Sequence, residues 1–128
     1  MQYRTPLSRV LGLGSAKAGS HHWWMQRVTA VALIPLSLFA VSLLNTLISD
    51  PYPQALAWLA SPLHGTFIIA WIICVFYHAA LGLQVVIEDY VAQEGMKVAA
   101  IWSANIVFFI LAIAAILAVL RIISAGSV

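Results

Sequence analysis

Residues 71–90 read WIICVFYHAALGLQVVIEDY, an apolar stretch that contains one histidine, His78, and ends in charged residues. A histidine this far inside a segment of hydrocarbon length is costly, and such residues usually mark functional sites. Asp89 follows His78 by eleven residues, which on a helix returns to nearly the same face, roughly 16 Å further along the axis. We therefore expect one helix face to carry a buried ligand candidate and, about three turns later, an acid at the water boundary. Tyr90 is expected about a third of a turn away from that face.

The composition is that of a membrane protein. Hydrophobic residues make up 63% of the 128 residues and charged residues only 8%, whereas an ordinary soluble domain has about 25% charged residues. The length is that of one domain, and the net charge of +2 is too small and too scattered to indicate nucleic-acid binding. We predict a single membrane domain over residues 1–128, with little of its mass outside the bilayer.

Three uncharged segments are long enough to cross a bilayer, which takes about 20 residues. They cover about residues 28–48, 63–87 and 98–120. Pro35 is expected to kink the first span, the prolines of SDPYP at 49–53 to end it, and residues 54–60 to form a short interfacial turn or helix. The sequence therefore predicts an all-α membrane protein with three transmembrane helices, preceded by a polar, basic cytoplasmic arm at residues 1–27.

The cations predict the orientation of the spans. Those before the first span are Arg4, Arg9, Lys17 and Arg27, Lys97 is in the second loop, and Arg121 follows the third span. Positive residues are enriched on the cytoplasmic side, which places the N-terminus inside and the C-terminus outside. Arg27, Asp89 and Tyr90 are then expected at the same inner boundary.

Three interpretations of His78 are open from the residues alone. As a ligand it would present a neutral nitrogen to haem iron, and Cys74 and Gly82, one turn to either side, would leave space for a flat macrocycle. As a proton relay it would need polar neighbours at depth, of which the sequence offers few. As a structural group it would donate or accept a hydrogen bond between helices. Because His64 is close to the opposite boundary, a six-coordinate haem would need its second ligand from another chain, and this chain would be half of a two-chain membrane bundle.

The ends of the first two spans supply further candidates. Asp89 and Tyr90 could bind a polar head such as a quinone carbonyl, with the phenol as hydrogen-bond donor and the carboxylate on a proton path. The alternative is a solvated helix end with an interface tyrosine. Arg27 and the pair His21 and His22 could bind haem propionates or a quinone oxygen, or Arg27 could serve only to fix the topology.

Several short motifs together resemble a known family. These are GSAK at 14–17, HWWMQRVTA at 22–30, and His78 with Gly82, Gln84, Asp89 and Tyr90. The chain resembles the small hydrophobic membrane anchor of succinate dehydrogenase (respiratory complex II), in its alphaproteobacterial form. The resemblance implies a multi-pass protein of the bacterial inner membrane, rather than of the mitochondrial inner membrane, that serves electron transport and the tricarboxylic acid cycle.

The resemblance also implies partners and residue roles. The partners are a flavoprotein that oxidises succinate, an iron–sulfur protein that passes electrons to ubiquinone, and a second anchor of the cytochrome b556 type. His78 would be one axial ligand of the haem b iron, Tyr90 would hydrogen-bond the quinone beside Asp89, and Arg27 would lie near the haem propionates and the quinone pocket, with His22 a further propionate candidate. The chain itself would contain no catalytic residue for succinate and would be a non-catalytic subunit of the enzyme.

Other functions compete with this interpretation. The chain could be a haem-free structural anchor. It could also be the anchor of a fumarate reductase, because the direction of the reaction between succinate and fumarate depends on redox potentials that this chain does not reveal. A small proton-channel or transporter subunit belongs to another class. It is disfavoured because the other two spans lack ionisable groups at depth.

Overall fold

The structure, a computed structural model, describes residues 17–126 and, within them, the side chains of residues 20–125. The expected arm residues Arg4 and Arg9 and the GSA of the first motif lie outside this range. Every element in the described part is a helix. The four are α2 (Lys17–Ser49), α3 (Tyr52–Ala60), α4 (Pro62–Tyr90) and α5 (Glu94–Gly126).

Three of these helices are long and apolar enough to cross a membrane. Their candidate spans are Ser20–Ser49, Pro62–Tyr90 and Glu94–Ala125. The prediction of an all-helical chain is therefore confirmed for the described residues, with three helices that are candidates for crossing a membrane. Each of them extends beyond the uncharged segment that predicted it. The largest difference is at the start, where residues 17–27 of the expected arm are already helical, because a helix satisfies its own backbone hydrogen bonds wherever no proline interrupts them.

Prolines and one cap explain where the helices end and begin. Pro51 is the N-cap of α3, and Pro53 lies in its first turn, where a proline is tolerated because that backbone N–H has no partner within the helix. Pro62 is the first residue of α4, and the Ser61 hydroxyl accepts a hydrogen bond from the backbone N–H of His64 at 3.4 Å. This is the capping contact expected of a serine at that position.

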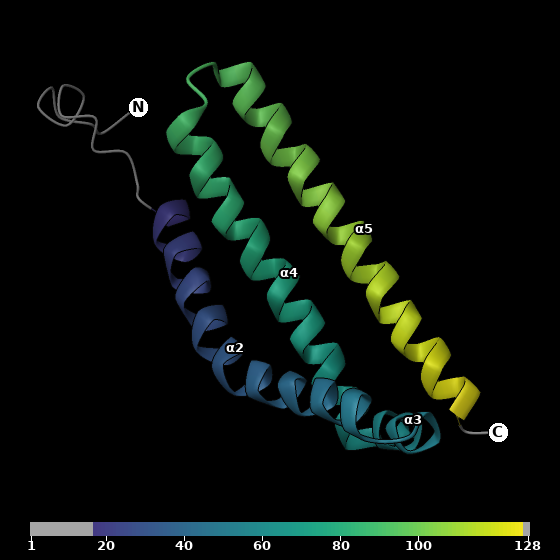
Figure 1. The fold of residues 1–128 in the computed structure, drawn as a ribbon. Helices are drawn as coiled ribbons and strands as arrows, with labels where there is room; N and C mark the ends of the chain where they lie inside the picture. Colours follow the sequence, from purple (N-terminus) through teal and green to yellow (C-terminus); the bar gives the residue numbers. More distant parts are fainter. Residues whose placement is uncertain (1–16, 127–128) are drawn as a thin grey trace, which may run out of the picture.

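The helix α4 lies between α2 and α5, as Figure 1 shows, and within the described residues α2 and α5 make no contact with each other. The start of α2, the end of α4 and the start of α5 lie at one end of the molecule, and α3 lies at the other. Figure 1 also shows a bend in α2, the helix that contains Pro35, as the sequence predicts. Contacts of His78 with Gln26 and Thr29 join α4 to the N-terminal half of α2.

The hydrophobic core lies at the α3 end. Leu59, Ile68 and Ile72 are buried there, and the ring of His64 stacks on Trp58 with centroids 3.9 Å apart while its Nδ1 lies 2.8 Å from the Trp58 carbonyl oxygen. His64 therefore contacts Trp58 at the start of α4, far from His78, as expected. Most other large apolar side chains on the three long helices are exposed, which is the surface of a chain that meets lipid or other subunits.

Candidate functional site

His78 lies in the contact between α4 and α2, where two polar side chains reach its ring. Its Nδ1 is 2.9 Å from Thr29 Oγ1, and its Nε2 is 3.5 Å from Gln26 Nε2. Thr29 and Gln26 are three residues apart and therefore share one face of α2. The structure thus supplies polar neighbours for His78 at depth, where the sequence led us to expect few.

Thr29 is the most buried polar residue in the described part of the chain, with 7% of its surface exposed. Its hydroxyl also lies 2.8 Å from the carbonyl oxygen of Met25 and 3.1 Å from that of Gln26. A hydroxyl in a helix commonly donates to a carbonyl of the preceding turn in this way. The Thr29 oxygen therefore joins the α2 backbone to the His78 ring.

The two small residues that flank His78 also face α2. The Cys74 thiol donates to the carbonyl oxygen of Thr29 at 3.5 Å, and a Cβ added to Gly82 would lie 3.4 Å from Gln26 Nε2. Within 4 Å of an added Gly82 Cβ the structure has only the end of the flexible Gln26 side chain, so the space that the sequence predicts beside His78 lies at the contact with α2. Small residues allow close approach of a neighbouring helix, and here α2 approaches α4 at Cys74 through its backbone and at Gly82 through the Gln26 side chain.

Two buried polar atoms in this region have no hydrogen-bond partner among the described residues. They are His22 Nε2 and Gln26 Oε1, on residues four apart and therefore on one face of α2. Leaving such a group unpaired costs about 1–3 kcal/mol, so groups of this kind usually gain a partner in the functional state. We call the set the His78 cluster, and it consists of His22, Gln26, Thr29, Cys74 and His78.

Arg27 is exposed, and its guanidinium stacks over the Trp23 ring at 4.4 Å from the centroid. Its neighbour Gln26 contacts His78, so Arg27 lies near the level of His78 along the bundle. Tyr90 is twelve residues further along α4, roughly 18 Å at 1.5 Å per residue. The structure therefore separates Arg27 from Tyr90 by about three turns, instead of bringing both to one level as the charge pattern suggested.

Asp89 and Tyr90 form the last turn of α4. The helix continues to Tyr90, so His78 and Asp89 do lie on one uninterrupted helix. Both terminal residues are exposed, Tyr90 at 85%, and among the described residues neither side chain has a hydrogen bond or an ion pair. Their polar groups are therefore free to meet a molecule or a subunit at this end of the bundle.

Known proteins of similar sequence show which family the chain belongs to. The sequence profile of the succinate dehydrogenase/fumarate reductase transmembrane subunit matches residues 1–120. The chain belongs to this family. It is 33% identical over 120 residues to the succinate dehydrogenase hydrophobic membrane anchor subunit of Rickettsia bellii, which covers 91% of this chain and 94% of that protein. It is 32% identical over 103 residues to the corresponding subunit of Paracoccus denitrificans, which covers 80% of each chain. No solved structure matches the chain.

The resemblance noted in the sequence is thereby confirmed. The protein is a multi-pass membrane anchor subunit of the succinate dehydrogenase/fumarate reductase type, and its matched relatives are mostly alphaproteobacterial. In this anchor subunit, Thr29 and Gln26 are the two site residues that sequence reasoning missed. The only signal in the sequence is that the Thr29 hydroxyl and the Gln26 amide lie three residues apart and therefore on one face of a helix. The sequence alone does not indicate that this face meets His78.

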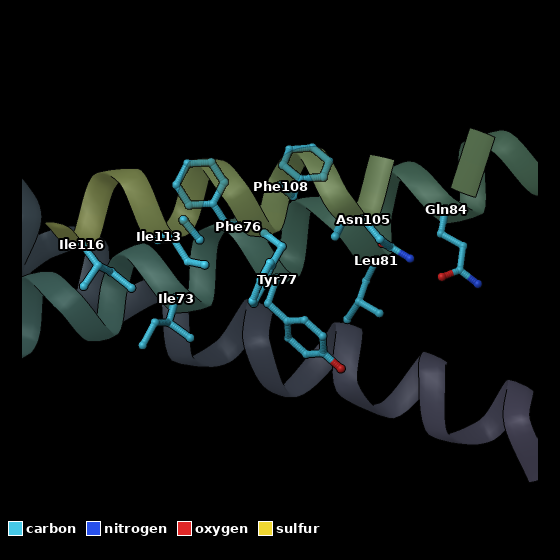
Figure 2. A pocket seen from close by; sticks show the side chains of 12 residues that line it. Ile73, Phe76, Tyr77, Leu81, Gln84, Asn105, Phe108, Ile113 and Ile116 are labelled. Atoms are coloured by element: carbon cyan, nitrogen blue, oxygen red, sulfur yellow. The ribbon is translucent and has the colours of Figure 1, made fainter. Parts of the chain in front are cut away.

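The anchor subunit also contains an apolar cavity of about 480 Å³ between α4 and α5. Figure 2 shows Phe76 and Phe108 above it and the amides of Gln84 and Asn105 toward one end. None of the predicted site residues lines this cavity, because His78 lies on the face of α4 that meets α2. The cavity is therefore separate from the His78 cluster.

Proposed function

We propose that this chain is an anchor of a bacterial succinate:ubiquinone oxidoreductase. It would hold the flavoprotein and the iron–sulfur protein to the inner membrane and form a bundle with a second anchor chain of the cytochrome b556 type. The observation that supports this most directly is the family match over residues 1–120. The structure agrees with it, because the cluster of buried apolar residues is small and lies toward the α3 end, while the long helices expose most of their large apolar side chains.

The proposed orientation has the N-terminus inside. Lys97 is in the first turn of α5, Arg27 is in the N-terminal half of α2 near the level of His78, and Arg121 is near the C-terminal end of α5. Positive residues favour the cytoplasmic side, so the end that contains Asp89 and Tyr90 would face the cytoplasm, where the two hydrophilic subunits would dock. Residues 1–128 would form one membrane domain.

The His78 cluster fits one axial contact to haem b. His78 would supply an imidazole nitrogen, and the glycine at position 82 leaves room that only the flexible side chain of Gln26 enters. Because Gln26 Oε1 has no partner in the described chain, turning that side chain aside would break no hydrogen bond at that atom. His22 and Arg27, which lie on the same stretch of α2, fit the propionates. When bound, the haem would supply a one-electron redox centre, and residues of the other anchor chain would help to hold it.

At the end of α4, Tyr90 and Asp89 would bind ubiquinone. The Tyr90 hydroxyl would donate a hydrogen bond to a quinone oxygen and stabilise the charge that develops there during reduction. The Asp89 carboxylate would hold a proton beside it. This chain would break no bond in succinate. Its residues would bind and orient the quinone, and the electrons would come from the iron–sulfur partner.

A haem-free structural anchor is the second candidate, and one observation favours it. The His78 ring already has neighbours at both nitrogens, Thr29 and Gln26, so its role could be to join α4 to α2. A proton channel is less well supported, because the polar residues of the His78 cluster end at Thr29 and the apolar residues 30–33 follow on α2. Whether a complex of this type would reduce fumarate instead depends on the reduction potentials of the redox centres in the partner subunits.

Deletion of this chain in a host that encodes the whole complex tests the anchor function. We expect the succinate-dependent reduction of a soluble dye to move from the membrane fraction to the soluble fraction, and succinate-dependent ubiquinone reduction to disappear. Re-expression of the chain should restore both. Dye reduction that remains bound to the membrane, together with unchanged ubiquinone reduction in the deletion strain, would contradict the proposal.

A further inference from the structure

We infer that Thr29 is a positioning residue for His78, which fixes the orientation of the imidazole and keeps the lone pair on Nε2, the atom that would face a haem iron. The inference deepens the proposed function and rests on it. It concerns which nitrogen of the ring carries the hydrogen, a property that hydrogen-bond partners decide.

The hydroxyl of Thr29 has a single proton and three neighbours that compete for it. Two of them, the carbonyl oxygens of Met25 and Gln26 at 2.8 and 3.1 Å, can only accept. The third is His78 Nδ1 at 2.9 Å, which can donate or accept depending on the tautomer. When the hydroxyl proton goes to the α2 backbone, the oxygen can only accept from the ring. Nδ1 then carries the hydrogen and donates it to Thr29.

The other side of the ring points to the same tautomer. The group that faces His78 Nε2 at 3.5 Å is the amide nitrogen of Gln26, which is only a donor. A donor at this position suits a lone pair on Nε2 and would repel an N–H. In the chain without haem both neighbours therefore favour the neutral ring with hydrogen on Nδ1, and this is the form in which Nε2 can act as a ligand once the Gln26 side chain turns aside; the Thr29 contact at Nδ1 stays in place.

The position of Thr29 itself is firmly held. Its side chain is buried and branched at Cβ, which restricts its rotamer in a helix. Its carbonyl oxygen accepts from the Cys74 thiol, one turn before His78 on α4. Thr29 therefore contacts α4 at two successive turns, through its backbone and through its side chain, and the hydroxyl has little freedom to follow a rotating imidazole.

A hydrogen bond from the far nitrogen of a ligating histidine orients the ring and raises the basicity of the ligating nitrogen. A more basic axial nitrogen favours the oxidised iron, so the bond lowers the reduction potential, which depends on contacts to the axial ligand. Loss of the Thr29 oxygen should therefore raise the haem midpoint potential and allow a wider range of ring orientations.

The test uses the assembled complex with Thr29→Val, which removes the oxygen and keeps the branched shape, and Thr29→Ser, which keeps the oxygen. Cys74→Ala is the matched control, because it removes the other contact to Thr29 without touching the ring. The measurements are haem content per flavin, the haem midpoint potential, and the electron paramagnetic resonance signal of the ferric haem. We expect Thr29→Val to keep haem, with a raised potential and a broadened signal, while Thr29→Ser and Cys74→Ala stay near the wild-type potential.

Full haem content with an unchanged potential and signal in Thr29→Val would overturn the inference, as would an equal shift in Cys74→Ala. If the complex with Thr29→Val does not assemble, the Thr29→Ser variant shows whether the hydroxyl oxygen or the methyl group of Thr29 is required. Its assembly with haem supports the role of the oxygen, and its failure to assemble would show that the methyl group is what matters. A wild-type complex without haem would instead refute the proposed haem ligation, so the two failures are distinguishable.

Discussion

The substitution His78→Leu removes the imidazole and keeps a side chain of similar size at the α2–α4 contact. Two contacts are lost, the 2.9 Å contact to Thr29 and the 3.5 Å contact to Gln26. Hydrogen bonds between membrane helices contribute about 0.6 kcal/mol on average and at most about 1.7 kcal/mol, and a contact of 3.5 Å is near the limit of a hydrogen bond. The expected structural cost is therefore about 1–2 kcal/mol.

This cost is too small to prevent folding of the bundle. The buried residues Leu59, Ile68 and Ile72 lie at the α3 end, and leucine adds apolar contact where the imidazole was. We therefore expect His78→Leu to assemble with its partner subunits and to lose the haem absorption. The assay is purification of the complex through this chain, followed by haem content per flavin and identification of the subunits by mass.

The variant Thr29→Val is the control for this experiment. It removes the same 2.9 Å contact but leaves the imidazole in place, so it should retain haem. An assembled His78→Leu complex with unaltered haem absorption would refute ligation by His78. Failure of both variants to assemble would show that the contact between the helices contributes more than its hydrogen bonds suggest, and the haem-free structural role would then be favoured.

Three further predictions concern single side chains. Tyr90→Phe should leave assembly and haem unchanged but slow succinate-dependent ubiquinone reduction, while dye reduction stays normal; equal quinone rates would remove Tyr90 from the quinone site. Gly82→Leu should abolish haem binding in an assembled complex, because it fills the space beside His78, and a normal haem spectrum in this variant would contradict that use of the space. Gly65→Val should lower the melting temperature of the complex, since an added Cβ would lie 2.9 Å from Ile123 Cδ1, which can move, and 3.3 Å from the backbone carbonyl oxygen of Leu59, which leaves no room for the valine methyl groups, and overpacking costs about 1–3 kcal/mol. The control Gly95→Ala, with nothing within 4 Å of the new Cβ, should leave the melting temperature unchanged.

The helices could be predicted from the sequence because their signals are local. A bilayer requires about 20 apolar residues, and the uncharged lengths and the prolines at 51 and 53 mark where such helices run and stop. The helix α2 begins at Lys17, before the uncharged span that starts at about residue 28, because a helix continues into the polar boundary as long as its backbone N–H and C=O groups are paired. Nothing in the hydropathy of residues 17–27 reveals that extension.

The contacts of the candidate site were less predictable because they depend on the register between α2 and α4. His78 stood out as a polar residue at depth, yet its partners Thr29 and Gln26 are 49 and 52 residues away in sequence. The same register places Arg27 near the level of His78, whereas the charge pattern grouped it with Tyr90. Helical periodicity fixes which residues share a face of one helix, but it does not fix how far one helix slides along another.

A reduced-minus-oxidised absorption spectrum of the complex purified through this chain, with its subunits identified by mass, tests the central claim most directly. We predict a b-type haem signal together with the flavoprotein, the iron–sulfur protein and a second anchor chain. The same partners without a haem signal would leave the anchor role intact and contradict the assignment of His78 as an axial ligand.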